Sequence, residues 1–489
     1  MDEKYMRYVR QNRKKVGVSI LILIFLIASG IFILYVIQSD YSLIPLNKTV
    51  YITGDGSGNF TCDGSDDQIE INQALAYVAK HPQYSTVHLK GPYTYVISDS
   101  ILIGSNTVLQ GDSTAVIKLK DKASWQSGKP LLTQLDSTGI HGVTIKGFEI
   151  NGNHDNNQDK KKGNGYYNMI SFLDSKNIQV HDMYLHDGHG DGLKVERGSN
   201  IQFYNNTVYK LGHDGLYAID SQNIEAWNNA ITCRTNSGLR VWNSNHVKFH
   251  DNVIDSFFDW SAGGPGILIE KSTGIVNDVE VCNNTIHNTY GPGIWLIGYG
   301  ESYPKEEALN VHIHHNTFYD TGTNPDIDWV GGIVTSGFYD TLIENNVLDG
   351  IYHAAIINMY PSASVGTSDP VDLSPQGTGY TTTVRNNIIV NTQKRTENPE
   401  ETGYAVINYL PKTHSFMLEN NCLYNNVGGN YKQAKSTTDI YLDPLFVNQN
   451  KHDYHLKSNS PCIGAGYVSS NSSKKLGESQ DKINVGRYS

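Results

Sequence analysis

Four consecutive segments decide the fold: NIQVHDMYLHDGHGDGLKVER (177–197), NIQFYNNTVYKLGHDGLYAID (200–220), NIEAWNNAITCRTNSGLRVWN (223–243) and NHVKFHDNVIDSFFDW (245–260). They begin at positions 177, 200, 223 and 245, so the interval between them is nearly constant. Each reads as a strand, an Asn turn, a strand, a Gly turn and a strand, although the end of the fourth is remodelled. A repeat of this length predicts a stacked array whose units bury their apolar faces against one another.

One asparagine marks the coils of this array. The second Asn of the first turn recurs at Asn206, Asn229, Asn252, Asn284, Asn316, Asn346, Asn387 and Asn421. After Asn252 the intervals lengthen, so the later coils are the same coil with loops inserted. A polar residue that recurs within an apolar repeat predicts an inward ladder of amides about 4.8 Å apart. We therefore predict an all-β chain folded as a right-handed parallel β-helix, whose hand follows the usual crossover rule.

We expect a cap at each end of this solenoid. Residues 49–98 form the expected N-terminal cap and contain one helix begun by Asp66 or Asp67. The expected apolar face of that helix is Ile69, Ile71, Ala74, Leu75 and Val78. Residues 99–438 form the expected β-helix, and residues 439–489 form the C-terminal cap. The string GSDDQIEINQAL also resembles the N-terminal cap of pectin-lyase-like β-helix proteins.

The N-terminus predicts a membrane anchor. Residues 16–37 carry no charge, and an apolar segment of this length can span a bilayer. Residues 1–15 hold six Lys and Arg, so the positive-inside rule places this tail in the cytoplasm. Ala28-Ser29-Gly30 lies in mid-segment and is a poor cleavage site, which predicts an uncleaved single-pass anchor. After a stalk at 38–48, we expect the rest of the chain outside the cell.

Charge and cysteine content narrow the choice of partners. Residues 1–37 hold six of the 38 Lys and Arg and two of the 49 Asp and Glu. The remaining chain therefore has 32 basic and 47 acidic groups, a formal charge of −15. This balance argues against nucleic acid as a partner and suits divalent cations. The five cysteines are scattered without metal-type spacing, which predicts structural thiols. No feature predicts an oligomeric state.

Alignment of the coils places side chains in columns on one exposed sheet. The strands GLKVE, GLYAI and GLRVW alternate between core and surface, so Lys194, Tyr217 and Arg240 form one outward row. Leu268 and Trp295 extend this row in the remodelled coils. The next outward row is Glu196, Ile219, Trp242 and Glu270. In the preceding turn, Asp191, Asp214 and Ser237 stack, with His189, His213 and Arg234 beside them.

These columns contain the residue types that an acidic polysaccharide requires. Aromatic rings stack on sugar faces, and Arg binds a carboxylate through a fork of N–H groups. Elimination needs a cation on the uronate carboxylate, a Lys, His or Arg base for the adjacent proton, and an acid for the leaving oxygen. Hydrolysis instead needs two carboxylates flanking the bond. Asp191 and Asp214, one coil or roughly 5 Å apart, have a separation close to that of a retaining enzyme.

The predicted site follows from these columns. The candidate catalytic residues are Asp187, His189, Asp191, Lys194, His213, Asp214 and Arg240. The candidate substrate-binding residues are Tyr217, Arg234, Trp242 and Trp295. Asp191, Asp214 and Glu196 are candidate metal ligands, with Ca²⁺ as the candidate cofactor. Asp, His and Asn are also ordinary turn formers, so each residue taken singly has a purely structural alternative.

Part of the chain resembles the disaggregatase-related family of methanogenic archaea. The residues that carry this resemblance are HNTYGPGIWLIGYG, VHIHHNTFYDTGTNPDIDWVGGIVTSG, IENNVLDGIYHAAIINMYP and VRNNIIVN, between about Gly188 and Lys394. The resemblance implies an acidic substrate at the archaeal cell surface, similar to methanochondroitin, which contains uronic acid and N-acetylgalactosamine. It supplies no catalytic motif, so the predicted site rests on the columns alone.

The sequence thus predicts a cell-surface enzyme, anchored by one helix, that cleaves an acidic polysaccharide. Elimination and hydrolysis remain open at this point. One alternative is a non-catalytic surface protein that binds a matrix glycan. Another is a uronate C5-epimerase on the same scaffold, which would change stereochemistry without cutting the chain.

Overall fold

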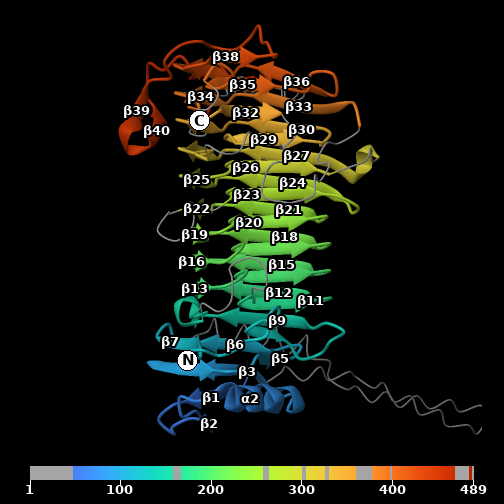
Figure 1. The fold of residues 1–489 in the computed structure, drawn as a ribbon, viewed down its shortest axis with the longest axis vertical. Helices are drawn as coiled ribbons and strands as arrows, with labels where there is room; N and C mark the ends of the chain where they lie inside the picture. The colour runs from blue at the N-terminus through green and yellow to red at the C-terminus, as the bar shows by residue number, and fades with distance from the viewer. Residues whose placement is uncertain are drawn as a thin grey trace, which may run out of the picture.

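The repeats fold as a parallel β-helix. The computed structural model describes residues 48–157, 167–256, 264–299, 304–324, 330–358, 377–396, 399–467 and 484–486. Within these residues the chain winds through three long parallel sheets, and each regular coil adds one strand to every sheet. The coils stack along the long axis of the molecule (Figure 1). We name the three sheets A, B and C.

Sheet A has 14 strands among the described residues. In spatial order they are β2 (Phe60–Thr61), β1 (Lys48–Thr53), β3 (Tyr84–Leu89), β6 (Val108–Gly111), β9 (His141–Lys146), β12 (Lys176–His181), β15 (Ser199–Tyr204), β18 (Gln222–Trp227), β21 (Asn245–His250), β24 (Val276–Cys282), β27 (Ala308–His314), β30 (Thr341–Glu344), β33 (Tyr380–Arg385) and β36 (His414–Glu419).

Sheets B and C each have 12 described strands. Sheet B comprises β4 (Tyr93–Ile97), β7 (Ala115–Leu119), β10 (Glu149–Asn151), β13 (Tyr184–Gly188), β16 (Thr207–Leu211), β19 (Ala230–Arg234), β22 (Val253–Ile254), β25 (Thr285–His287), β28 (Thr317–Tyr319), β31 (Val347–Asp349), β34 (Ile388–Val390) and β37 (Cys422–Tyr424). Sheet C comprises β5 (Ile101–Ile103), β8 (Leu132–Gln134), β11 (Ile170–Leu173), β14 (Leu193–Glu196), β17 (Leu216–Ile219), β20 (Leu239–Trp242), β23 (Ile267–Lys271), β26 (Ile294–Gly298), β29 (Ile333–Ser336), β32 (Ala354–Asn358), β35 (Tyr404–Asn408) and β38 (Gly429–Lys432).

The coils pair in the predicted register. Leu193 lies opposite Leu216, which lies opposite Leu239, and all three side chains are buried in the core. Their neighbours along each strand point outward, because successive side chains of a strand face opposite sides of its sheet. Stacks of Val, Ile, Leu and Phe from the three inner faces form one continuous apolar core along the solenoid.

The asparagine ladder is present as predicted. Nδ2 of Asn206 donates to Oδ1 of Asn229 at 3.0 Å, and Nδ2 of Asn229 donates to Oδ1 of Asn252 at 2.9 Å. Each Oδ1 also accepts the backbone N–H of the preceding Asn, as from Asn206 at 3.0 Å. The same bonds continue through Asn284, Asn316, Asn346, Asn387 and Asn421. The ladder therefore satisfies the buried polar groups of one turn from coil to coil along the solenoid.

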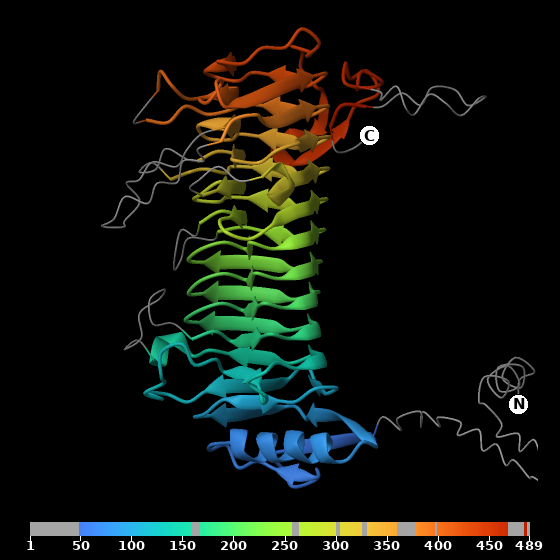
Figure 2. The ribbon, with the colours of Figure 1, turned by 90° about the vertical axis from the view of Figure 1, so that its right-hand side faces the viewer.

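The helix α2 (Gln68–Lys80) covers the N-terminal end of the core (Figure 2). It buries Ile71, Ala74, Leu75 and Val78 as predicted, whereas Ile69 is exposed, contrary to prediction. Asp67 occupies the N-cap position but makes no side-chain capping bond. Its buried carboxylate instead accepts the backbone N–H groups of Asp63, Gly64 and Val96 at 2.8–3.1 Å. This carboxylate thus ties the loop before the helix to strand β4.

The C-terminal coils lie at the opposite end from α2. The strands β39 (Phe446–Asn448) and β40 (Asp453–Leu456) form a small antiparallel pair at the side of the last coils (Figure 1). Three short 3₁₀ helices among the described residues span His154–Asn156, Lys305–Glu307 and Gln449–Lys451. The predicted anchor at 16–37 lies outside the described residues. Among those described, no helix is both long and apolar enough to cross a membrane.

Candidate functional site

The predicted row on sheet C exists and is centred on Tyr217. Lys194 lies opposite Tyr217 on the neighbouring strand, and Tyr217 lies opposite Arg240. The Lys194 Nζ is 5.8 Å from the centre of the Tyr217 ring, and the Arg240 Cζ is 4.3 Å from it. The ring is therefore flanked by two cations, a contact that its negative faces favour. The row is less open than predicted, because Tyr217 is only 8 % exposed. Burial raises the pKa of its phenol above the usual range, which keeps it protonated.

The turn before this row joins two aspartates through one histidine. His213 Nδ1 donates to Asp191 Oδ1 at 2.6 Å and lies 3.2 Å from Asp214 Oδ2. The backbone N–H of Asp214 donates to Asp191 Oδ1 at 3.0 Å, and that of Ser237 donates to Asp214 Oδ1 at 2.6 Å. Both carboxylates are completely buried, whereas the His213 side chain is 16 % exposed. The histidine is therefore the part of this cluster that reaches the surface.

The charge state of His213 follows from these contacts. Burial alone would lower its pKa, but the carboxylates of Asp214 and Asp191 raise the pKa of His213 to about 9. Burial raises the pKa of Asp214, and the nearby His213 and Arg240 cations oppose that change. His213 therefore carries a positive charge at neutral pH, and the site presents a third cation beside Lys194 and Arg240.

A second buried pair holds the guanidinium of Arg240. Its Nε donates to Glu270 Oε2 at 2.6 Å, and its Nη1 lies 3.5 Å from Asp214 Oδ2. The Tyr299 hydroxyl donates to Glu270 Oε1 at 2.6 Å, and its ring stacks on Trp242 at 5.5 Å. Burial raises the pKa of Glu270, against the effect of Arg240. These contacts fix the direction in which Arg240 points, which a bidentate carboxylate site requires.

Two of these residues were not among the predicted site residues. Glu270 was placed in the outward row that contains Trp242, and the structure pairs them there, but its role as the partner of Arg240 was missed. The sequence did contain an indication of this ion pair, because Arg240 and Glu270 carry opposite charges and lie in adjacent outward rows. Tyr299 directly follows β26, and nothing in the repeat pattern indicates that its ring turns back onto Trp242.

Asp187 and His189 lie outside this cluster, contrary to prediction. Asp187, in sheet B, accepts from His186 Nδ1 at 2.7 Å and lies 3.2 Å from Lys210 Nζ. His189 is completely buried, with Nε2 2.9 Å from the Asn157 carbonyl oxygen and its ring 4.3 Å from that of Tyr167. Asp187 lies near the end of β13 and His189 lies in the turn that follows, so neither belongs to the row of Lys194, Tyr217 and Arg240 on sheet C.

Arg234 is not available to a substrate, contrary to prediction. Its guanidinium is completely buried, where it donates to the backbone carbonyls of Asp255 and Pro265, the latter at 3.1 Å. It lies opposite the buried Leu211 in sheet B. Arg234 therefore satisfies backbone groups inside the turn.

Trp295 occupies its predicted place in the row, opposite Leu268, but it belongs to a different cluster from Tyr217. It packs with Leu268, Val334 and Ile357 in an apolar cluster on the outer side of sheet C, and only 7 % of it is exposed. Of the predicted substrate-binding residues, Tyr217 and Trp242 are the two that lie at the cluster of His213 and Arg240.

The structure brings together only two of the three predicted metal ligands. Asp191 and Asp214 are together, but Glu196 lies at the far end of β14 and binds Arg197 at 2.6 Å. With His213, the two aspartates offer two oxygens and one nitrogen within 4.8 Å of one another. Ca²⁺ takes six to eight oxygen ligands, so these residues do not fit it. A Ca²⁺ requirement stays a prediction, which an assay after chelation tests.

A groove of about 520 Å³ lies elsewhere, on the outer face of sheet A. Its lining includes Gln179, Gln202, Glu225 and Lys248. Gln179 Nε2 donates to Gln202 Oε1 at 2.8 Å, so part of its floor is engaged in ladder hydrogen bonds. The cations around Tyr217 make sheet C the better candidate for chemistry.

Two family models each match part of the chain. Residues 276–483 match the family described as disaggregatase related. Residues 168–348 match the family described as right-handed beta helix region, in agreement with the predicted fold and hand. Tyr217, His213 and Arg240 lie in the second match and before the first. No curated protein sequence matches the chain.

Several solved structures match much of this chain, each with a TM-score below 0.5. The A-module of the mannuronan C-5 epimerase AlgE4 from Azotobacter vinelandii is 16 % identical, with 80 % of this chain and 100 % of that chain covered and a TM-score of 0.48. An exopolygalacturonase from Thermotoga maritima is 11 % identical, with coverages of 76 % and 87 % and a TM-score of 0.46. An α-1,3-glucanase from Streptomyces thermodiastaticus is 17 % identical, with coverages of 78 % and 65 % and a TM-score of 0.48. At such identities the likeness is one of fold.

Proposed function

We propose that this protein is a carbohydrate-active enzyme that binds an acidic polysaccharide over Tyr217 on the outer face of sheet C. The observation that carries the proposal is the pair of cations, Arg240 and His213, beside the ring of Tyr217, with the Lys194 amino group 5.8 Å from the centre of the same ring. A uronate residue combines an apolar ring face with a carboxylate. Tyr217 offers the complementary ring, and the cations offer the complementary charge.

Buried carboxylates support this assignment by holding the cations in place. Glu270 orients Arg240, and Asp191 and Asp214 orient His213. Preorganised charges in a poorly solvated site stabilise developing negative charge without having to reorganise during the reaction. Arg240 and His213 are therefore suited to neutralising a uronate carboxylate, which makes the adjacent C5–H acidic.

The proposed reaction is proton abstraction from C5. The Lys194 side chain, in its neutral amine form, takes the C5 proton and becomes an ammonium, and the electron pair of the C–H bond enters the C5–carboxylate system. In elimination this pair forms the C4=C5 double bond, the C4–O4 bond breaks, and the protonated phenol of Tyr217 gives its proton to O4. In epimerisation Tyr217 returns a proton to the opposite face of C5, and no glycosidic bond breaks. Both reactions use Lys194 as the base and Tyr217 as the acid, with Arg240 and His213 beside the carboxylate.

Hydrolysis by Asp191 and Asp214 is less well supported. Both carboxylates are completely buried, and both are engaged by His213 and by backbone N–H groups. A hydrolase needs one carboxyl group that reaches the leaving oxygen and a second that reaches a water molecule or C1. The two aspartates instead support His213 from beneath the surface.

The substrate class and location form a further part of the proposal. The disaggregatase-related match at 276–483 supports an archaeal matrix glycan similar to methanochondroitin. The uncharged segment 16–37 supports a single-pass anchor with the β-helix outside the cell. Protease protection of the N-terminal tail in intact cells, with loss of the β-helix domain from the surface, tests this orientation.

The activity is tested by incubating the full-length protein with uronate-containing glycans. Elimination yields 4,5-unsaturated ends, detected by their ultraviolet absorbance. Epimerisation yields incorporation of solvent deuterium at C5 without chain shortening. New reducing ends without unsaturation would establish hydrolysis and overturn the proposed chemistry. Tight binding that leaves the glycan unchanged would favour the non-catalytic alternative.

A further inference from the structure

A second cluster of reactive side chains lies on the outer face of sheet A, away from the row on sheet C. Glu280 and Cys282 are separated by one residue on β24, so their side chains share one face of the sheet. On the next strand, His312 lies opposite Glu280 and His314 lies opposite Cys282. Four potential metal ligands are thus neighbours on one face of the parallel sheet, two on β24 and two on β27.

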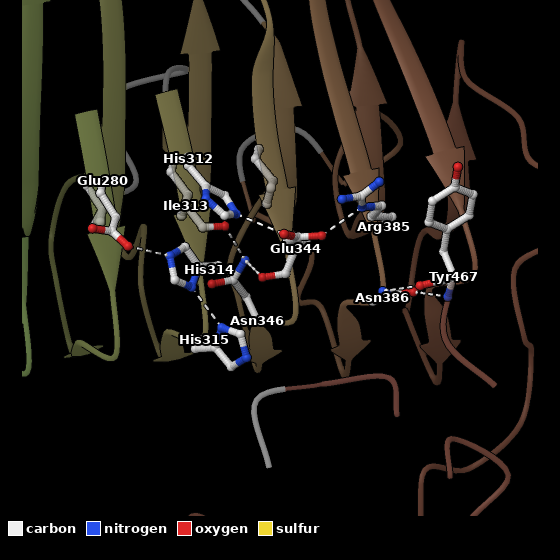
Figure 3. Close-up of polar contacts among 12 residues, drawn as sticks. Glu280, His312, Ile313, His314, His315, Glu344, Asn346, Arg385, Asn386 and Tyr467 are labelled. Carbon is white, nitrogen blue, oxygen red and sulfur yellow. Dashed lines mark hydrogen bonds and ion pairs between the residues drawn. The ribbon is translucent and has the colours of Figure 1, made fainter. Parts of the chain in front are cut away.

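Three of these side chains converge. One ligand atom from each of Glu280, Cys282 and His314 lies within 4.8 Å of the other two. His314 Nε2 is 3.0 Å from Glu280 Oε1 (Figure 3). The other oxygen, Glu280 Oε2, is 2.9 Å from Lys248 Nζ. Glu280 therefore presents one oxygen toward the histidine, and Cys282 is almost completely buried beside them.

Neighbouring residues orient both imidazoles. His314 Nδ1 is 2.8 Å from His315 Nδ1, so that the other ring nitrogen is directed at Glu280 (Figure 3). The His312 ring lies against that of His314 with ring centres 4.0 Å apart and a tilt of 33°, and its Nε2 is 2.9 Å from Glu344 Oε1. Arg385 Nε donates to the other oxygen of Glu344 at 2.7 Å. A histidine that binds metal through one nitrogen is usually oriented through the other, as His314 is here.

We infer that Glu280, Cys282 and His314 form a binding site for a divalent transition-metal ion of the Zn²⁺ class. Thiolate, imidazole and carboxylate are the ligands that Zn²⁺ takes in proteins, whereas Ca²⁺ and Mg²⁺ prefer oxygen alone. Three protein ligands leave one position of a tetrahedron for water or for a further side chain. Because the ligands come from β24 and β27, the ion would clamp two successive coils.

Two other groups of possible metal ligands occur among the described residues, and neither combines a free carboxylate oxygen, a thiol and an imidazole. Cys62 and Glu70 lie near Asp67, but Asp67 already accepts three backbone N–H groups. The cluster of Asp191, Asp214 and His213 contains no thiol and supports the row on sheet C. His250 lies opposite Cys282 on β21, but its ring nitrogens are engaged by Glu225 at 3.3 Å and by Asp251 at 2.6 Å. The inference does not depend on the function proposed for sheet C.

Metal titration of the chelator-treated full-length protein tests this inference. We expect one high-affinity equivalent of Zn²⁺ by calorimetry and a rise in Tm on binding. Co²⁺ bound at the same site should show a thiolate-to-metal charge-transfer band in the wild-type protein, which requires no variant to fold. Cys282→Ser should abolish this band, and His314→Gln should abolish high-affinity binding. His315→Ala, which removes only the orienting contact, should weaken binding about 10- to 100-fold.

Two variants serve as matched controls. His246→Gln alters an exposed histidine of the same sheet that pairs with Asp278, and Cys62→Ser alters a buried cysteine in the cap. Both variants should bind Zn²⁺ like the wild type. The inference is overturned if the wild type binds no stoichiometric Zn²⁺, or if bound Co²⁺ shows no thiolate band. It is also overturned if folded Cys282→Ser and His314→Gln proteins, judged by circular dichroism, retain wild-type affinity.

Discussion

The Nε of Arg240 donates to Oε2 of Glu270 at 2.6 Å, and the two side chains are 12 % and 2 % exposed. Removing one member of such a pair leaves the other buried without its counter-charge. We expect Glu270→Leu to lower the free energy of unfolding by about 3–5 kcal/mol in a urea titration. Asp174→Asn is the control, because its ion pair with Arg197 is about half exposed and should contribute less than about 1 kcal/mol. Equal losses in the two variants would contradict this account.

His213 should make stability depend on pH. Its pKa is about 9 in the folded protein against an ordinary 6.5, so the folded state binds the proton more tightly than the unfolded chain. Its contribution, about 3 kcal/mol, is therefore complete below pH 6.5 and disappears as the pH rises through 9. The measurement is the difference in unfolding free energy between wild type and His213→Gln from pH 6 to 10.

The groups that face His213 bear on this experiment. They are Asp191, Asp214, Asn236, Arg240 and the Tyr217 ring. Both proteins contain all of these groups, so the difference between wild type and His213→Gln from pH 6 to 10 reports on the imidazole. A difference that stays constant between pH 6 and 10 would show that the two carboxylates do not hold a proton on His213.

Substitution in the buried asparagine ladder should lower the free energy of unfolding much more than substitution in the exposed asparagine row of Asn177, Asn200 and Asn223. Asn229→Ala removes the acceptor of two bonds from Asn206 and the donor to Phe203 and Asn252, all buried. Unsatisfied buried groups cost about 1–3 kcal/mol each, so we expect a loss of at least about 3 kcal/mol by thermal or urea unfolding. Asn223→Ala is matched, because it removes a bond to Asn200 of similar length, 3.0 Å, that is exposed to solvent. Its cost should stay below about 1 kcal/mol.

Tyr217→Phe tests the proposed proton transfer. The variant keeps the ring and its contacts with Lys194 and Arg240 but removes the phenolic proton. We expect kcat to fall by about 10²- to 10⁴-fold with KM little changed, in an assay of unsaturated ends or of deuterium incorporation. Tyr184→Phe, on the outside of sheet B, should leave both constants unaltered. A Tyr217→Phe enzyme with unchanged kcat would remove the hydroxyl from the mechanism.

Arg240→Gln tests recognition of the carboxylate. It keeps a polar side chain near Glu270 but removes the charge that we assign to the uronate. Affinity for an acidic glycan should fall by about 1.5–3 kcal/mol, the value of a charge-assisted hydrogen bond, while a neutral glycan is unaffected. Arg197→Gln, which removes a surface cation at the end of the same sheet, should leave affinity for both glycans unchanged. Binding measured by calorimetry at low and high salt would distinguish the two variants.

The nearly constant interval between repeats was sufficient to predict the architecture, because a solenoid is built from contacts between successive coils. Register follows from that interval: Lys194, Tyr217 and Arg240 share a row since each lies one coil from the next. The Asn ladder was equally predictable, because a buried amide that recurs in register can bond only its equivalents above and below. Local and repeated interactions thus determined the fold, the columns and the core.

Only the tertiary structure decided which polar residues of these columns are accessible. Asp187 and Arg234 lie at the ends of strands in sheet B and His189 lies in the turn that follows, where a small change in backbone direction decides whether a side chain points inward or outward. Glu270 and Tyr299 reach Arg240 and Trp242 across coils whose lengths differ, so no constant offset in the sequence joins them. The thiol and imidazoles of β24 and β27 likewise share no sequence motif. They meet because Cys282 and His314, a full coil apart in the chain, lie on strands that are side by side in the sheet.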